Sequence, residues 1–353
     1  MISRRIALFG ISTLAFSLLL AGLLPVFSAD SPVDKPPKPP LGLPKVQWPE
    51  DNPYSAAKVE LGRFLYFDKR LSADGSVSCA SCHSPEKAFT DGEPFSTGIG
   101  GQKGGRSAPT VINQAYNTWQ FWDGRAASLE EQAKGPIANP IEMTSEKTAD
   151  AAHAAVVKRL KGVPGYVKLF DKVFGTKDIT IDHVAKAIAT FERTVYSGNA
   201  PFDRYNEGDK KAMSESQVRG MNIFFNKAAC DSCHLGFNFT DGSYENIGIG
   251  MDKPQPDLGR YVVSKKEEDK GAFKPPPLRA VEHHSPYMHD GSLKTLADVV
   301  EHYNKGGIKN PHLNERIKPL NLTDQDKKDL VDFLKALSGE GWQHFKAPEK
   351  FPE

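Results

Sequence analysis

Cysteine is scarce in this chain of 353 residues, which contains four cysteines. A disulfide scaffold is typical of much smaller secreted domains, and a four-cysteine zinc site does not need a histidine directly after each cysteine pair. These alternatives explain the pattern less well than covalent c-type haem attachment, for which Cys-x-x-Cys-His is the characteristic spacing. We therefore expect two covalently bound haem c groups, held by Cys79, Cys82 and His83 and by Cys230, Cys233 and His234.

An excess of charge of either sign is also lacking. The chain has 45 Lys and Arg against 44 Asp and Glu, which gives a formal net charge of +1. Binding to a phosphate backbone depends on clustered positive charge. The composition therefore excludes a nucleic-acid partner, and it leaves the oligomeric state open.

Alternating strand patterns are scarce, whereas apolar residues recur at three- and four-residue spacing in several segments. This spacing predicts amphipathic helices, and proline and glycine punctuate long loops between them. We expect a mainly α fold with two cytochrome c-type haem domains in tandem and long loops. The predicted helices cover residues 55–66, 163–174, 181–195, 216–225, 295–303 and 323–337.

The N-terminal 29 residues have the pattern of an export signal. Arg4 and Arg5 precede an apolar run over residues 6–24, and small residues follow near Ala29. The run is long for a signal peptide, so an uncleaved membrane anchor is the alternative, and the arginine pair leaves twin-arginine export open. The proline-rich residues 30–52 predict an extended linker. We expect the protein to work in a bacterial periplasm.

The surroundings of the two haem motifs match each other. Phe-Asp-Lys precedes the first motif and Phe-Asn-Lys the second, and Phe-Thr-Asp-Gly and Gly-Ile-Gly follow both. Such self-similarity is typical of one structural unit used twice. We predict an N-terminal haem domain over residues 53–205 and a C-terminal haem domain over residues 206–353.

Several motifs outside the repeat resemble the bacterial dihaem cytochrome c peroxidase family. They are Gln-Phe-Trp-Asp-Gly-Arg at 120–125, Glu-Gln-Ala-Lys-Gly-Pro at 131–136, Ile-Glu-Met at 141–143 and Pro-Tyr-Met-His-Asp-Gly at 286–291. The resemblance runs from about residue 53 to the end of the C-terminal helix and includes both haem motifs in order. It implies that the first haem is the peroxide site and that the second is the electron-transfer haem.

The resemblance also implies catalytic residues around the first haem. The tryptophan between the haems falls on Trp122, with Trp119 as its competitor, and the peroxide pocket contains Gln132, Pro136 and Glu142. A carboxylate over the iron suits peroxide cleavage, because a proton must pass from one oxygen to the other. Without the resemblance, Glu142 would read as a solvated loop carboxylate.

Two departures from ordinary family members bear on the haem ligands. The loop over residues 93–105 contains no histidine that would act as a second ligand to the first haem, so we expect an open iron there. At the methionine position of the second haem the chain has Tyr303, as MauG-like members do. A phenolate favours oxidised iron, and a helix turns the adjacent residue about 100° away, so His302 and Tyr303 do not both serve. Competing ligands are His302, Met251, Met288, His283 and His284.

Two further family features are less well preserved. The resemblance implies a Ca²⁺ ion between the domains, with backbone carbonyls at His284 and Pro286 and a side-chain oxygen at Ser107, where an asparagine is more usual. Serine is a weaker ligand for a hard cation. The surface tryptophan of MauG corresponds to Ala228, which puts the same exit route to a partner in doubt.

Three functions follow from these observations. The first is a MauG-like oxidoreductase that reacts with hydrogen peroxide and uses a paired high-valent state to oxidise a periplasmic partner protein. The second is a peroxidase that detoxifies hydrogen peroxide with electrons from a small cytochrome c or a copper protein. The third is a dihaem electron-transfer cytochrome, against which Gln132 and Glu142 beside an open iron argue.

Overall fold

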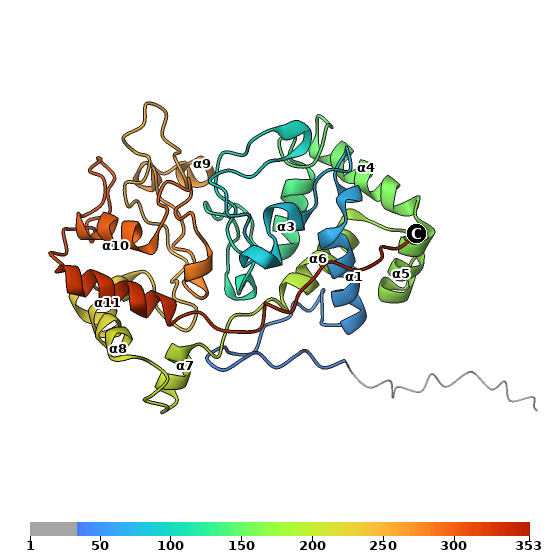
Figure 1. The fold of residues 1–353 in the computed structure, drawn as a ribbon. Coiled ribbons are helices and arrows are strands. Elements are labelled where there is room, and N and C mark those ends of the chain that lie inside the picture. Colours follow the sequence, from blue (N-terminus) through green and yellow to red (C-terminus); the bar gives the residue numbers. More distant parts are fainter. Residues whose placement is uncertain (1–33) are drawn as a thin grey trace, which may run out of the picture. The chain divides into compact units, whose positions relative to one another are not determined.

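The structure, a computed structural model, describes residues 34–353, and the regular elements in this range are helical (Figure 1). Only isolated β-bridges occur there, such as that between Ser84 and Thr90, so the mainly α fold is confirmed. The signal expected over residues 1–29 lies outside the described residues, as does the start of the linker. The α-helices are α1 Ala56–Phe67, α2 Cys79–Cys82, α3 Leu129–Ile137, α4 Ala149–Lys161, α5 Pro164–Phe174, α6 Ile181–Glu192, α7 Pro201–Asn206, α8 Glu215–Asn222, α9 Tyr261–Ser264, α10 Leu296–Asn304 and α11 Asp324–Lys335.

All six helices predicted from apolar spacing are present, as α1, α5, α6, α8, α10 and α11. All but α5, which begins at Pro164, start at a side-chain cap: in α6, for example, the Thr180 hydroxyl accepts a hydrogen bond from the backbone N–H of His183. The predicted end of α8 at residue 225 falls inside a π-helical turn, Ile223–Lys227, that continues it. The sequence did not predict α3 and α4.

The same helix crossing occurs once in each half of the chain. A Cβ atom on Gly62 of α1 would lie 2.0 Å from the Ala187 carbonyl oxygen of α6, and one on Gly220 of α8 would lie 1.9 Å from the Asp329 carbonyl oxygen of α11. No side chain fits at either crossing, so glycine lets the two backbones meet. The pairs α1–α6 and α8–α11 therefore give the sequence repeat a structural counterpart.

Buried apolar residues form two hydrophobic clusters. The first contains Leu65 and Phe191 together with other residues of the first half, and the second contains Phe224 and Phe333 with other residues of the second half. The C-terminal segment leaves α11 and returns to the first half, where the Gly165 N–H donates to the Glu353 carbonyl oxygen at 2.6 Å (Figure 1). The division into domains at residues 205 and 206 stays a prediction.

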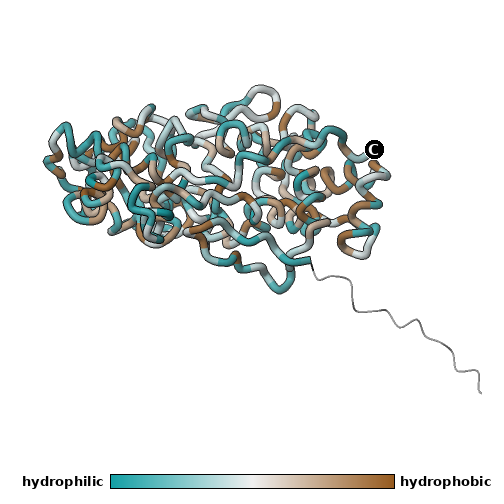
Figure 2. The backbone as a smooth tube through the Cα atoms, turned by 60° about the horizontal axis from the view of Figure 1, so that its bottom comes forward, coloured by the Kyte–Doolittle hydropathy of each residue, from teal (hydrophilic) through white to brown (hydrophobic). Residues whose placement is uncertain are grey.

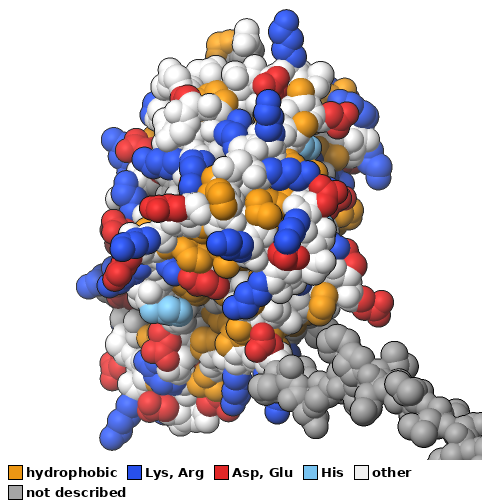
Figure 3. Space-filling model, turned by 90° about the vertical axis from the view of Figure 1, so that its right-hand side faces the viewer, with side chains coloured by type: hydrophobic (Ala, Val, Ile, Leu, Met, Phe, Trp, Pro, Cys, Tyr) orange, Lys and Arg blue, Asp and Glu red, His pale blue; other side chains and the backbone are white. Residues whose placement is uncertain are grey.

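Hydrophobic stretches are short and alternate with hydrophilic ones along the described chain (Figure 2). No helix within residues 34–353 is both long enough and apolar enough to span a bilayer. On the face shown in Figure 3, Lys and Arg side chains are interspersed with Asp and Glu side chains. This mixing agrees with the balanced charge of the sequence.

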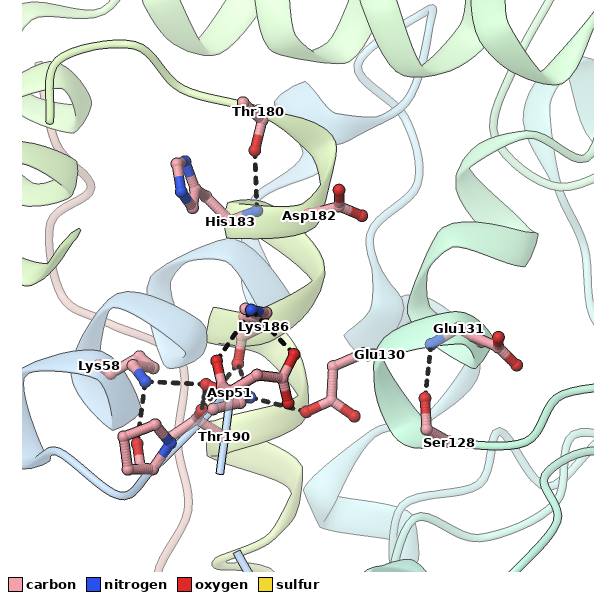
Figure 4. A network of polar contacts seen from close by, with 12 residues as sticks. Asp51, Lys58, Ser128, Glu130, Glu131, Thr180, Asp182, His183, Lys186 and Thr190 are labelled. Atoms are coloured by element: carbon pink, nitrogen blue, oxygen red, sulfur yellow. Dashed lines mark hydrogen bonds and ion pairs between the residues drawn. The ribbon is translucent and has the colours of Figure 1, made fainter. Parts of the chain in front are cut away.

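A polar network fixes α3 against α6 (Figure 4). Glu130 in the first turn of α3 accepts hydrogen bonds from Arg193 at 2.6 and 2.9 Å and from Asn52 at 2.7 Å. Lys58 of α1 donates to Asn52 at 2.8 Å, and Lys186 of α6 pairs with Asp51 at 3.0 Å. Because Glu130 and Arg193 are largely buried, the network holds the start of α3 in a defined position.

Candidate functional site

The first haem motif forms one turn of helix, α2. The Ser78 N–H donates to the Ser81 hydroxyl at 3.0 Å at its start, and the His83 N–H donates to the Cys79 carbonyl oxygen at 2.9 Å at its end. The Tyr66 hydroxyl also donates to the His83 carbonyl oxygen at 2.8 Å. This turn brings both thiols and the imidazole to one wall of a cavity of about 460 Å³, which we call the first cavity.

All four catalytic residues predicted around the first haem line the first cavity. Gln132 and Pro136 lie four residues apart on α3 and therefore share one face of that helix. Glu142 follows the helix, and Trp122 comes from the loop before it. The structure thus brings residues 122–142 to the same space as the Cys-x-x-Cys-His motif. Their catalytic roles stay predictions.

Glu142 is half-buried rather than solvated. Its Oε1 accepts a hydrogen bond from Asn139 Nδ2 at 2.6 Å, and burial raises the pKa of its carboxyl group. Gly98 allows this placement, because a Cβ atom there would lie 1.9 Å from the carbonyl oxygen of Ile141. A carboxyl group with a raised pKa is suited to holding and moving a proton near neutral pH.

Glu192 is a second buried carboxyl in the first cavity, and the sequence did not point to it. Its Oε2 has no hydrogen-bond partner, and the neighbouring Arg193 is engaged by Glu130. Burial raises the pKa of Glu192 to about 8. Glu192 comes at the end of the apolar pattern of α6. No sequence pattern indicates that its carboxyl group faces a cavity.

The second haem motif lines a cavity of about 200 Å³, the second cavity. Within the motif, His234 Nδ1 lies 2.9 Å from the Phe239 carbonyl oxygen, which fixes the ring and leaves Nε2 for a metal. Phe239 and its repeat counterpart Phe89 both have left-handed backbones, with φ of 55° and 60°. His83 Nδ1, by contrast, is buried without a partner.

Tyr303 of α10 lines the second cavity together with Cys230, Cys233 and His234. Burial raises the pKa of Tyr303, so its hydroxyl stays neutral unless a cation lies beside it. Of the competing ligands, Met288 also lines this cavity. The His302 Nε2 lies 3.0 Å from the Ile247 carbonyl oxygen. The lining of the second cavity does not include the other candidates, which are His302, Met251, His283 and His284.

Trp122 lies between the two cavities and lines both. Its Nε1 donates to the Ser107 carbonyl oxygen at 2.9 Å, and its ring centroid lies 6.5 Å from that of His289. Trp119 is 38% exposed and lines neither cavity. The geometry therefore favours Trp122 over Trp119 as the residue between the haem sites.

The structure supports the expected calcium site less than it supports the two haem sites. The Ser107 N–H donates to the His289 carbonyl oxygen at 2.7 Å, and Ser107 lines the first cavity. His284 is mostly buried with Nε2 unpartnered, and Pro286 follows a cis peptide bond. Within residues 34–353 no cluster of three or more His, Cys, Asp or Glu residues would hold a metal ion. Calcium at the carbonyl groups of His284 and Pro286 stays a prediction.

Comparison with known proteins identifies the family. A family model described as di-haem cytochrome c peroxidase matches residues 56–211. The methylamine utilization protein MauG of Methylorubrum extorquens is 44% identical over 298 residues, which cover 84% of this chain and 82% of that protein. The chain belongs to the di-haem cytochrome c peroxidase family. It is thus an oxidoreductase acting on peroxide, and the family implies two haem c groups.

Other relatives carry peroxidase names. The cytochrome c551 peroxidase of Nitrosomonas europaea is 40% identical over 290 residues, with 82% of each chain covered. Among solved structures, a MauG-like protein associated with microbial copper homeostasis superposes with a TM-score of 0.78 at 33% identity, covering 86% of this chain and 95% of that one. The relatives therefore do not separate a MauG-like role from a peroxidase role.

The residues present fit two haem c groups. Each cavity has the two free cysteines and the histidine of one haem motif on its wall, and each of these two histidines offers a ring nitrogen to a metal. Thioether attachment needs free thiols rather than a disulfide, and no disulfide joins these four cysteines.

Proposed function

We propose that this protein is a periplasmic, MauG-like enzyme that reacts with hydrogen peroxide at the first haem and oxidises a partner protein. The observation that carries the proposal is the position of Tyr303 on the wall of the second cavity. A phenolate ligand favours oxidised iron, whereas the thioether of a methionine favours reduced iron. A second haem bound by His234 and Tyr303 is suited to sharing oxidising equivalents rather than to accepting electrons from a small donor.

The histidine content of the first cavity supports an open peroxide site. His83 is the one histidine among the residues that line this cavity. The haem, when bound, supplies the iron at which peroxide is reduced. The protein contributes Glu142, which holds a proton beside the peroxide site, and Gln132, which offers an amide for hydrogen bonding. Trp122 lies between the two cavities and lines both of them.

The second candidate is a peroxidase that takes electrons from a small cytochrome c or a copper protein. Two observations favour it. Relatives that are 37–40% identical carry cytochrome c551 peroxidase names, and Ala228 stands where MauG has its surface tryptophan. Met288 on the wall of the second cavity would be its axial ligand in place of Tyr303.

Replacement of Tyr303 by Met separates the two candidates. We expect Tyr303→Met to raise the reduction potential of the second haem, because a neutral thioether stabilises oxidised iron less than a phenolate does. His302→Ala is the matched control, since His302 is not among the residues that line the second cavity and its Nε2 lies 3.0 Å from the Ile247 carbonyl oxygen. The measurements are a spectroelectrochemical titration and steady-state peroxide reduction with reduced cytochrome c.

The MauG-like reading predicts slow turnover with cytochrome c in the parent protein and peroxide-dependent oxidation of a protein encoded beside it. Tyr303→Met should lose that oxidation while both haems stay attached. An unchanged potential in Tyr303→Met would make Tyr303 a packing residue, and the peroxidase reading would then lead.

A further inference from the structure

Lys274 is a buried cation at the junction of the two cavities. Its side chain is 6% exposed, and it lines both the first and the second cavity. Its backbone N–H donates to the Trp122 carbonyl oxygen at 2.8 Å, which fixes its position beside the tryptophan between the two sites. Apart from Lys274, the residues that line both cavities are Trp122 and Pro276.

Two arginines that line the cavities have acidic partners. Arg106 pairs with Asp123 and Asp257 at 2.7 and 2.6 Å. On the rim of the second cavity, Arg316 pairs with Glu245 at 2.5 Å. Each of these charges is therefore compensated within the protein.

Lys274 differs in that no ion pair or hydrogen bond of its ammonium group occurs within the part of the chain that the structure describes. Burial alone lowers its pKa, to about 8. Burying an unpaired charge costs several kcal/mol or more, so a lysine in this position needs an anion. That anion must come from whatever fills the two cavities.

We propose that Lys274 binds propionate carboxylates of the haem groups and serves both haem sites from one position. Every haem c has two propionates, which remain anionic near neutral pH and form charge-assisted hydrogen bonds with an ammonium group. The proposal rests on the two haem groups implied by the family and does not depend on whether Tyr303 is a ligand.

The shared position has an electrostatic consequence. A fixed positive charge near both irons stabilises the reduced form of each haem, because reduction lowers the positive charge on the iron. Lys274 thereby raises the reduction potentials of both haems. It is a positioning residue and takes no part in bond breaking.

The test uses the exported protein with both haems attached. We expect Lys274→Met to lower the reduction potentials of both haems in a spectroelectrochemical titration and to shift the propionate bending bands in resonance Raman spectra. The matched control is Lys270→Met, because Lys270 pairs with Glu267 at 2.6 Å away from both cavities. A pyridine haemochrome assay checks that every variant retains two haems.

A Lys274→Met protein that has two haems and the potentials of the control contradicts the proposal, and so does a shift confined to one haem. If Lys274→Met does not mature, Lys274→Arg keeps the charge and should mature with two haems at nearly parental potentials. Failure of Lys274→Arg as well would show that shape rather than charge is needed there. None of these failures would alter the outcome of the Tyr303 experiment.

Discussion

The two halves of the molecule share a framework but differ in what surrounds each haem motif. Both contain Cys-x-x-Cys-His, a glycine at a helix crossing and a left-handed phenylalanine after the motif. The first cavity is lined by the half-buried Glu142 and the buried Glu192, whereas the second is mostly apolar and has Tyr303.

The difference between the halves arises outside the matching segments around the two haem motifs. The distinguishing residues lie over 120–142 and at Glu192 in the first half and over 287–303 in the second. Attachment of the cofactor is thus separated in the chain from the residues that set its chemistry. The same motif unit is therefore used twice with different residues around it.

The largest effect is expected from Glu142→Gln. The amide keeps the shape of the side chain but cannot take up and return a proton, so reaction with peroxide should slow by about 10²–10⁴-fold. Stopped-flow absorbance after addition of peroxide measures the rate. Glu146→Gln is the matched control, since Glu146 is exposed four residues away. If Glu142→Gln reacts with peroxide as fast as the control does, the Glu142 carboxyl group has no role in peroxide cleavage.

A buried acid in the first half predicts loss of stability as the pH rises. The pKa of Glu192 is about 8 in the folded protein against an ordinary value of 4.5, so the unfolded state releases its proton first. Between pH 4.5 and 8 this residue should lower the free energy of unfolding by up to about 1.4 kcal/mol per pH unit.

Glu192→Gln should remove that dependence, and guanidinium denaturation of the two proteins at several pH values measures it. Glu86→Gln, at an exposed position of the same half, is the control. Equal pH profiles for Glu192→Gln and the parent would mean that the carboxyl group is ionised and paired in the haem-bound protein.

A buried histidine in the second half predicts the opposite trend. Burial lowers the pKa of His289 to about 4, so below pH 6.5 the unfolded state binds a proton that the folded state does not. Stability should therefore fall by up to about 1.4 kcal/mol per unit between pH 6.5 and 4. His289→Asn should reduce this pH dependence of the free energy of unfolding in the same denaturation series. If the free energy of unfolding of His289→Asn falls as steeply with decreasing pH as that of the parent, the effect belongs to other groups, such as His284.

Much of the fold was predictable because helices leave a periodic signal. In α6, Val184, Ile188 and Phe191 recur on one face and are buried. In α3, by contrast, two glutamates at the start and Pro136 near the end obscure the pattern, and its position depends on the pairing of Glu130 with Arg193. Such long-range pairs have no local signal in a sequence.

The candidate site divides in the same way. The haem attachment residues were readable from spacing alone, and Trp122, Gln132, Pro136 and Glu142 only from the family resemblance. Lys274 and Glu192 were not found by either route. A buried charge differs from a surface charge only through what surrounds it, and these surroundings come from segments far apart in the chain.

The most direct test of the difference between the two sites is electron paramagnetic resonance of the ferric protein with both haems attached. An open first site beside His83 and a second site ligated by His234 and Tyr303 predict one high-spin and one low-spin haem in equal amounts. Two low-spin signals and no high-spin signal would contradict the account, because an additional ligand would then occupy the first site.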